Sequence, residues 1–210
     1  MTAAALFNRY FDQCPLVAII RGVTPEEVEA VGEAIFAGGI RIIEVPLNSP
    51  DPLASIRRLS AAMGDRALVG AGTVLTPRDV EQVCHAGGKL IVSPNVNTDV
   101  IRASAAAGLV SAPGYFTPSE AFAAIDAGAT ALKLFPAEAA TPAVVKAQRA
   151  VLPKDLPLLI VGGVSPGNMR AWIEAGANGF GLGSGLYVPG RAPDEVGARA
   201  RDYVQALAST

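Results

Sequence analysis

The chain has 210 residues, 50% of them hydrophobic and 17% charged, which is typical of a globular protein and unlike a disordered one. Its 17 basic and 19 acidic residues give a net charge of −2, so the positive surface of a nucleic-acid-binding protein is absent. One His and two Cys are too few for a structural zinc site, and so few cysteines suit a reducing cytosol. We recognise no signal peptide and no apolar run of the ~18 residues that span a membrane. We therefore expect a cytoplasmic protein with neither a nucleic-acid nor a membrane partner.

The first segment, residues 1–14, is predicted to form a short amphipathic helix. Its apolar face would carry Leu6, Phe7, Tyr10 and Phe11. No Ser- or Pro-rich linker divides the rest, because the 22 glycines and 16 prolines are scattered along the chain. We therefore expect one domain that spans residues 1–210.

Eight short apolar runs follow the predicted helix, each rich in branched side chains and too short to be a helix. They are residues 16–20, 40–45, 67–71, 89–93, 109–112, 131–135, 158–161 and 179–183. Continuous apolar runs of about four to eight residues are typical of strands buried on both faces of a parallel sheet.

Helix signals lie between these runs. A capping residue before Pro predicts a helix start at Thr24, Thr76, Thr117 and Ser165. An Ala-Gly pair predicts a helix end at Gly38, Gly87, Gly108, Gly128 and Gly176, because glycine takes the left-handed conformation without a Cβ penalty. Eight strand–helix units predict an α/β fold, the (β/α)8 or TIM barrel. The alternative is an open doubly wound sheet, which eight evenly spaced units disfavour.

Active sites of such barrels lie at the carboxyl ends of the strands, which makes Lys133 the first candidate. It stands inside an apolar run, where strand alternation would send Leu132 and Leu134 outward and Lys133 into the barrel. A desolvated amine favours its neutral, nucleophilic form, as in Schiff-base lysines. The structural alternative is a lysine that only pairs with a buried carboxylate.

Glu44 occupies the same kind of position in the second run. A carboxylate beside an amine in a dry barrel can transfer protons, with its pKa set by that environment. The alternative is that Glu44 merely neutralises Lys133. Glu138, just past the sixth run, is the rival acid, and we expect it at the rim or at a helix start.

Small residues follow the seventh and eighth runs, at Gly162, Gly163, Gly183 and Ser184. These two loops are the usual phosphate site of a TIM barrel, since small residues let backbone N–H groups approach an anion. The alternative is tight turns without a ligand. No complete nucleotide-binding motif occurs.

Arg21 and Thr73 end the first and third runs and could hold a substrate carboxylate or hydroxyl. For Arg21 the alternative is a surface ion pair, and for Thr73 a turn. The following residues are expected to be structural: His85 at a helix end, Cys14 and Cys84 as small buried side chains, and Trp172 in helix packing. The residues together predict a phosphosugar enzyme that uses a Schiff-base lysine and a carboxylate, with no metal and no other cofactor.

Several motifs resemble those of the 2-keto-3-deoxy-6-phosphogluconate/phosphogalactonate aldolase family. They are AIIRG (18–22), IEVPLNSP (43–50), VGAGTVL (69–75), LIVSPN (90–95), ALKLFPAE (131–138), VGGV (161–164) and GLGS (181–184), in order through essentially the whole chain. The resemblance implies a class I aldolase on a (β/α)8 barrel, commonly a homotrimer, that cleaves a phosphorylated sugar acid to pyruvate and D-glyceraldehyde 3-phosphate. It implies Lys133 as the Schiff-base lysine and Glu44 as the proton acceptor and donor. Arg21 and Thr73 would then contact the acid end, and the four Gly and Ser positions the phosphate.

The two branches of that family act on substrates that differ in configuration at C4. The gluconate branch typically has an Arg in the motif after the catalytic Glu and a Thr before the Gly-Gly pair, where this chain has Asn48 and Val161. The chain therefore resembles the galactonate branch, with 2-dehydro-3-deoxy-6-phospho-D-galactonate as its substrate. The alternatives are the gluconate epimer, a phosphosugar isomerase or epimerase in which Lys133 acts electrostatically, and a catalytically silent ligand-binding barrel.

Overall fold

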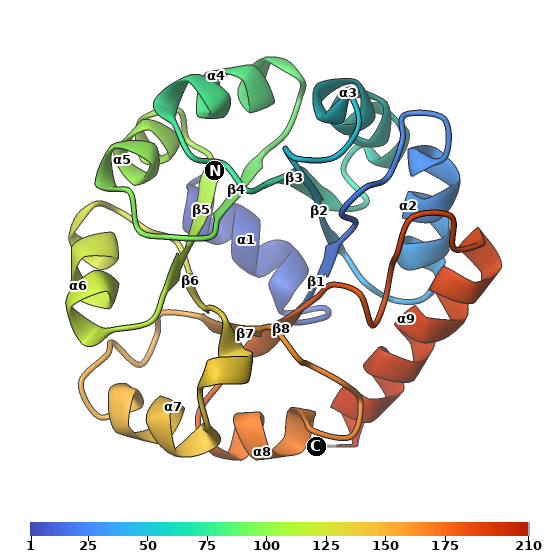
Figure 1. Cartoon of the computed structure of the whole chain (residues 1–210). Coiled ribbons are helices and arrows are strands. Elements are labelled where there is room, and N and C mark those ends of the chain that lie inside the picture. Colours follow the sequence, from blue (N-terminus) through green and yellow to red (C-terminus); the bar gives the residue numbers. More distant parts are fainter. Residues whose placement is uncertain (210) are drawn as a thin grey trace.

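Eight parallel strands close into a barrel in the order β1 to β8, and the helices form a ring around it (Figure 1). The structure is a computed structural model that describes residues 1–209, so Thr210 of the predicted domain lies outside the described part. The pairing of β8 with β1 closes the sheet. The predicted (β/α)8 barrel is confirmed, and the open doubly wound sheet is wrong.

Each predicted apolar run overlaps one strand. The strands are β1 (Leu16–Ile19), β2 (Ile42–Pro46), β3 (Leu68–Gly72), β4 (Leu90–Ser93), β5 (Val110–Tyr115), β6 (Leu132–Leu134), β7 (Leu158–Val161) and β8 (Gly179–Leu182). The helices are α1 (Ala3–Phe11), α2 (Val28–Ala37), α3 (Pro52–Met63), α4 (Pro77–His85), α5 (Thr98–Ala106), α6 (Pro118–Asp126), α7 (Pro142–Arg149), α8 (Met169–Glu174) and α9 (Pro193–Ala208), with a short 3-10 helix η1 (Ala137–Ala139).

Two of the four predicted helix starts are confirmed. Thr76 and Thr117 cap α4 and α6, and each side chain forms a reciprocal capping box with the third helical residue. The other two predictions are wrong, because α2 and α8 begin later. The N–H of Thr24 donates to Glu27 Oε1 and that of Ser165 to Asn168 Oδ1, so a turn precedes each helix.

Four predicted helix ends carry a left-handed glycine, at Gly87, Gly108, Gly128 and Gly176. At the fifth, α2 ends at Ala37 as predicted, but the left-handed residue is one position later. Gly38 is the C-cap with a φ of −72°, and Gly39 takes the left-handed φ of 106°.

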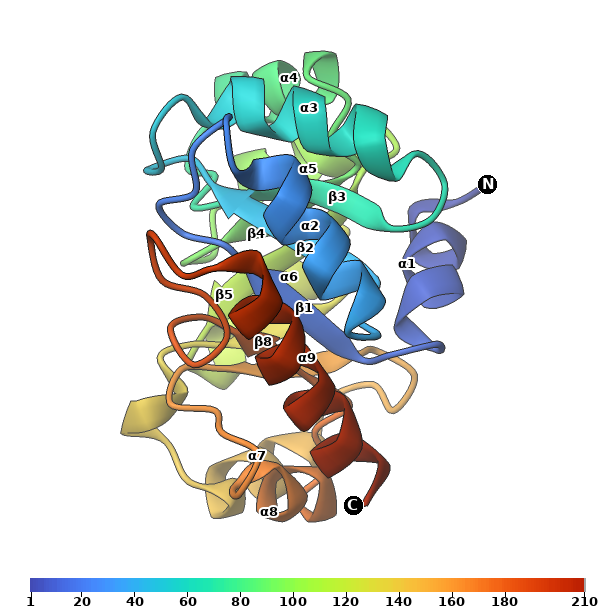
Figure 2. The ribbon, with the colours of Figure 1, turned by 90° about the vertical axis from the view of Figure 1, so that its right-hand side faces the viewer.

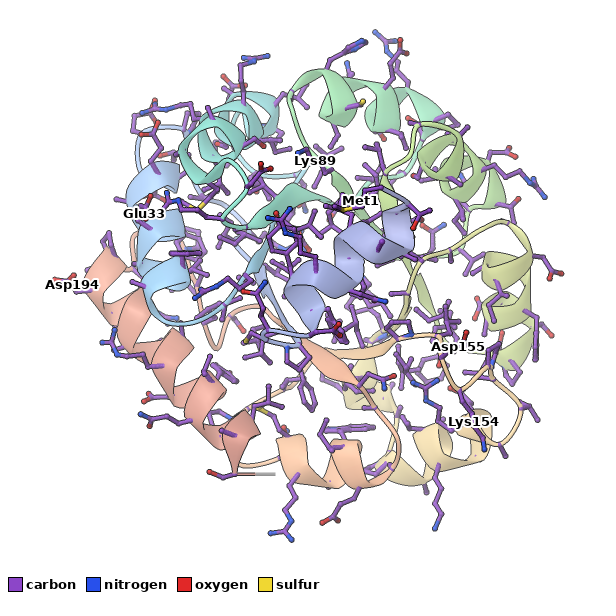
Figure 3. All side chains as sticks on the ribbon, turned by 180° about the vertical axis from the view of Figure 1, so that it is seen from behind. Met1, Glu33, Lys89, Lys154, Asp155 and Asp194 are labelled. Carbon is purple, nitrogen blue, oxygen red and sulfur yellow. The ribbon has the colours of Figure 1, made fainter. Side chains whose placement is uncertain are left out.

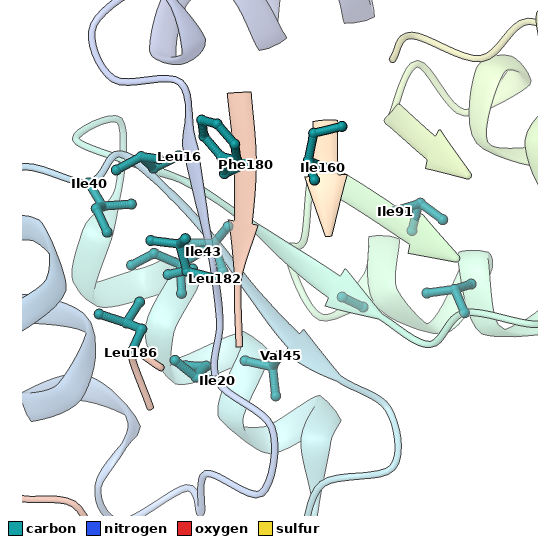
Figure 4. Packing of buried hydrophobic residues seen from close by; sticks show 14 of the residues in the cluster. Leu16, Ile20, Ile40, Ile43, Val45, Ile91, Ile160, Phe180, Leu182 and Leu186 are labelled. Atoms are coloured by element: carbon teal, nitrogen blue, oxygen red, sulfur yellow. The ribbon is translucent and has the colours of Figure 1, made fainter. Parts of the chain in front are cut away.

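The larger part of the core lies between the strands and the surrounding helices. Ile43 and Val45 of β2, and Leu132 and Leu134 of β6, belong to this layer. Figure 4 shows how side chains from neighbouring strands gather in it. These positions alternate with the ones that face the inside of the barrel, which is why the strands are apolar on both faces.

A second apolar cluster fills the barrel and extends to α1. It consists of Val17, Ile19, Ile42, Leu68, Leu90, Val92, Val110, Ala112, Ala131, Leu159 and Val161, with Phe7, Tyr10 and Phe11 of α1. The helix lies across the amino ends of the strands (Figures 2 and 3), with the rings of Phe7 and Phe11 stacked at a centroid distance of 4.7 Å. It therefore closes that end of the barrel.

The predicted N-terminal helix exists but ends at Phe11, not at residue 14. Pro15 explains this, because a residue before proline is biased away from the helical conformation. The predicted burial of Phe7, Tyr10 and Phe11 is confirmed, whereas Leu6 is only partly buried.

Of the four residues predicted to have structural roles, three lie as predicted and one does not. Cys14 and Trp172 are buried, and His85 occupies the last turn of α4, as predicted. The predicted burial of Cys84 is wrong, since this free cysteine is exposed. Helix α4 turns Val80 and Val83 toward the core. Cys84 follows Val83 and points about 100° away from it around the helix, which leaves it exposed. No helix in residues 1–209 is both long and apolar enough to cross a membrane.

Candidate active site

One cavity of about 460 Å³ opens at the carboxyl ends of the strands and contains every predicted site residue. It is lined by Arg21, Glu44, Thr73, Lys133, Val161, Gly162, Gly163, Gly183 and Ser184, together with other residues. Each of these residues lies on a strand or in the loop after it. They come from different strands, and closure of the barrel brings them together.

Lys133 is 6% exposed and points into the barrel from the middle of β6. Its register neighbours are Gly114 on β5, which has no side chain, and Leu159 on β7. The amine Nζ lies 4.9 Å from the centroid of the Phe135 ring. Within residues 1–209 it forms no ion pair within 4.0 Å, so the amine is buried without a direct carboxylate partner.

Glu44 is 3% exposed and lies inside the barrel on β2. Its carboxylate rests against Gly72 of β3, where an added Cβ would lie 1.9 Å from Oε2. That oxygen is buried and has no hydrogen-bond partner among the described residues. A buried carboxylate oxygen left free in a cavity is available to a ligand or a transferred proton.

Burial moves the two pKa values toward each other. It raises the pKa of Glu44 to about 7, against the opposing effect of the Lys133 and Arg21 charges. It lowers the pKa of Lys133 to about 8, where the Glu44 charge acts in the opposite direction and the Arg21 charge adds to the decrease. An amine and a carboxyl with such similar pKa values exchange a proton at little cost near neutral pH.

Arg21 and Thr73 meet at one side of the cavity. The Arg21 guanidinium donates to Oδ1 of Asn48 and, at 3.5 Å, to Oγ1 of Thr73. Thr73 itself takes a left-handed φ of 57°, which directs the chain away from the end of β3. The three side chains hold a fixed positive charge at the mouth, suited to a carboxylate.

The two glycine loops follow β7 and β8, and β8 pairs with β1, the strand that precedes Arg21. Gly162 and Gly163 have φ values of 115° and 63°, conformations that only glycine adopts readily. Within the described residues, the N–H groups of Val164, Ser184 and Gly185 donate to no protein acceptor. Free backbone donors around a cavity are what an anion requires.

Glu138 lies at the rim in η1, so both its expected positions are confirmed. Its side chain crosses the glycine loop, since a Cβ at Gly162 would lie 2.0 Å from Glu138 Oε2. Local sequence patterns do not predict this contact. They also do not predict the bond from Arg21 to Asn48 or the space that Gly72 leaves for Glu44, because each joins residues from different strand–loop segments.

The sequence model of the family described as KDPG and KHG aldolase matches residues 8–193 of this chain. The chain belongs to that family. As a member it is an aldolase, a carbon–carbon lyase, and the predicted family resemblance is confirmed.

Individual relatives agree with this assignment. The chain is 46% identical over 192 residues to the 2-dehydro-3-deoxy-6-phosphogalactonate aldolase of Escherichia coli (strain K12), covering 91% of this chain and 94% of that one. It is 34% identical to the 2-dehydro-3-deoxy-phosphogluconate aldolase of Pseudoalteromonas atlantica, over 78% of this chain and 76% of that one. A solved structure described as native KDPGal has a TM-score of 0.92 at 45% identity and covers 94% of this chain and 96% of that one.

Proposed function

We propose that this family member cleaves 2-dehydro-3-deoxy-6-phospho-D-galactonate to pyruvate and D-glyceraldehyde 3-phosphate through a Schiff base on Lys133. The observation that carries the proposal is a buried amine and a buried carboxylate in one cavity, with free backbone donors beyond them. The 46% identity to an enzyme named for the galactonate substrate supports the choice of sugar acid.

The first step joins Lys133 to the substrate. The neutral amine attacks the C2 ketone, and the resulting carbinolamine loses water to give a protonated imine. Glu44 transfers the protons of this step, since its pKa of about 7 lets it both accept and donate near neutral pH.

The second step breaks the C3–C4 bond. Its electron pair moves toward the protonated imine and leaves an enamine, while Glu44, directly or through water, accepts the proton of the C4 hydroxyl. The aldehyde leaves, the enamine is protonated at C3, and hydrolysis releases pyruvate and the Lys133 amine. No metal and no other cofactor takes part in this scheme.

The ends of the substrate have separate partners. Arg21, supported by Asn48 and Thr73, binds the carboxylate at the C1 end. The backbone of Gly162, Gly163, Gly183 and Ser184 binds the phosphate at the far end. The substrate then extends from Arg21 at one side of the cavity, past Lys133, to the loops after β7 and β8.

Val161 is the residue that we assign to C4 recognition. It is 6% exposed, lines the cavity and packs into the space left by Gly181, where an added Cβ would lie 2.7 Å from Val161 Cγ2. Its side chain offers no hydrogen bond to a C4 oxygen, so shape alone would discriminate between the epimers.

We also propose that residues 1–210 form one domain, that it assembles as a homotrimer and that it works in the cytoplasm. The barrel closes only when β8 pairs with β1, which ties the two ends of the chain together. The two free cysteines, Cys14 and Cys84, suit a reducing compartment.

Borohydride reduction in the presence of pyruvate tests the proposal. The wild-type chain should gain a pyruvate adduct and release pyruvate from the sugar acid, and Lys133→Ala should do neither. Lys146→Ala removes an exposed lysine of α7 and serves as the matched control. An undiminished adduct in Lys133→Ala would refute the Schiff-base role. No adduct in the wild type would favour the isomerase or epimerase, and no turnover at all the silent barrel.

A further inference from the structure

Several carbonyl oxygens of the two glycine loops accept hydrogen bonds from side chains outside the cavity. Arg191 Nη1 donates to the carbonyls of Ser184 at 3.3 Å and Leu186 at 2.7 Å. Arg199 Nη1 donates to Gly185 O at 3.1 Å, and the Tyr203 hydroxyl donates to Val164 O at 3.0 Å. These loops therefore have an outer face of occupied carbonyls and an inner face along the cavity.

The side chains that hold them form a single stripe. Arg191, Glu195, Arg199 and Tyr203 are spaced four residues apart, so they lie on one face of α9 and the turn before it. Glu195 Oε1 accepts from Nε of both arginines, at 3.3 Å and 3.1 Å. Helix α9 runs along the outside of the barrel beside α2 (Figure 2), which places this stripe behind the loops and outside the cavity.

Peptide geometry links the outer face to the inner one. In a trans peptide the C=O and the following N–H point in opposite directions. The bond from Arg191 to Ser184 O therefore fixes the direction of the Gly185 N–H, which has no protein acceptor among residues 1–209 and borders the cavity. Asn168 acts in the same way on the β7 loop, since its Nδ2 donates to Gly163 O at 2.8 Å and leaves the Val164 N–H free.

We propose that Arg191 is a positioning residue of the phosphate subsite, and that Arg199 and Tyr203 support it by anchoring the same loops. Arg191 holds Ser184 O outward, so that the free N–H of Gly185 stays aimed at the phosphate before it binds. Arg199 and Tyr203 hold the Gly185 and Val164 carbonyls, whose following N–H groups already donate to Gly183 O and Asn168 Oδ1. The two guanidinium groups and the Glu195 carboxylate that they share also leave a net positive charge behind a subsite that has no cationic side chain of its own in the cavity wall after β7 and β8. Arg191 is the main member, because its side chain is 12% exposed and holds two carbonyls. This inference rests on the phosphate end of the proposed function.

The experiment separates the phosphate end of the substrate from the pyruvate end. We expect Arg191→Met to raise KM for the phosphorylated sugar acid about tenfold, the scale of one hydrogen bond to a charged group. The rate of borohydride-trapped pyruvate adduct should stay unchanged, because pyruvate has no phosphate. Arg191→Lys should recover part of the loss. Tyr203→Phe removes a single hydroxyl and should raise KM by a smaller factor in a chain that still folds.

A binding measurement makes the test independent of catalysis. Inorganic phosphate should bind Arg191→Met about tenfold more weakly than the wild type, measured by calorimetry. Arg170→Met removes an exposed arginine of α8 whose one ion-pair partner among residues 1–209 is Glu174, and it should change nothing. An unchanged KM and phosphate affinity in Arg191→Met and Tyr203→Phe would overturn the inference. An equal loss of adduct formation and phosphate binding would also overturn it, since the residues would then act through the whole fold. A wild type that binds phosphate but forms no adduct would instead overturn the proposed function.

Discussion

Glu44 and Lys133 have opposite charges when ionised, and burial inside the barrel disfavours the ionised form of each. A buried ion pair would hold the lysine protonated and unreactive. Within residues 1–209 no ion pair joins the two within 4.0 Å. Burial lowers the Lys133 pKa, and the Arg21 charge adds to the decrease. The site thereby keeps a fraction of neutral amine near pH 7 without losing the nearby carboxylate.

Replacement of Glu44 with Gln separates its two effects. We expect kcat to fall by about 10²–10⁴-fold, as for lost acid–base catalysis. The negative charge of Glu44 raises the Lys133 pKa, so its removal should lower that pKa further. The rate of pyruvate imine formation, which in the wild type should rise with pH through about 8, should then rise at a lower pH. The pH profile of borohydride trapping measures this shift.

Two outcomes would contradict that expectation. A midpoint that stays in place or moves to higher pH would mean that Glu44 does not act on the Lys133 amine. A kcat close to that of the wild type would transfer the proton role to Glu138 or to water.

Val161 is tested by a nearly isosteric change. Val161→Thr adds a hydroxyl at the same volume, and we expect it to shift the kcat/KM ratio about tenfold toward the gluco epimer, the scale of one hydrogen bond. The wild type should turn over both epimers, with the galacto compound at least as good. Measured ratios for both substrates in both proteins decide the matter. A wild type that strongly prefers the gluco epimer, or a ratio that does not change, would refute the assignment.

At the scale of the elements, β3 acts on the site through a missing side chain. Glu44 lies on β2, but its carboxylate occupies the volume that a side chain at Gly72 of β3 would need. The register neighbour of Lys133 on β5 is also a glycine, Gly114, but there an added Cβ would meet the backbone of Pro94, with Pro94 O at 2.4 Å. Only the Glu44 carboxylate therefore lies in the space that a neighbouring glycine leaves.

Gly72→Ala should therefore reduce catalysis, although residue 72 has no functional side chain of its own. The added Cβ would meet Glu44 Oε2 at 1.9 Å, so the carboxylate must move, and we expect kcat to fall at least about tenfold. Gly167→Ala is the matched control, since nothing lies within 4 Å of its Cβ. Steady-state kinetics with circular dichroism would test this, and a kcat equal to that of the control would show that Glu44 tolerates displacement.

The sequence predicts those parts of the fold and the site that follow from local patterns. Strand alternation placed Lys133 and Glu44 inside the barrel, and the chain order of the loops identified both glycine pairs. The predicted starts of α2 and α8 were wrong, because a turn precedes each helix. The side chains of Glu27 and Asn168 accept hydrogen bonds from the backbone N–H groups of these turns. Contacts such as Gly72 with Glu44, or Arg191 with Ser184 O, depend on packing between elements and leave no local signal.

At the scale of the whole molecule, large apolar side chains remain exposed on the half of the ring that follows β3, β5 and β6. They are Leu75, Phe116, Phe122 and Phe135, of which Phe135 also lines the active-site cavity. We expect the proposed homotrimer to cover the other three, because contact between copies of the chain would remove them from water.

We expect sedimentation to give three times the 21.5 kDa mass of the chain. Phe122→Glu places a charge in this surface and should shift the protein toward monomers, because an unpaired charge is costly to bury. Val151→Glu is the control, since Val151 is exposed after α7, away from these four residues in the chain. A wild type that sediments as a monomer would refute the trimer.

Helix α1 closes the amino end of the barrel, so the active-site cavity opens at the carboxyl ends of the strands. Lys133 and Glu44 lie deep within the strands, and the glycine loops lie at the entrance. In the proposed reaction the keto-acid fragment bound to Lys133 would lie deeper in this cavity than the phosphorylated aldehyde. We therefore expect ordered release, in which the aldehyde departs before the keto acid, and ordered binding in the reverse direction, in which the keto acid arrives first.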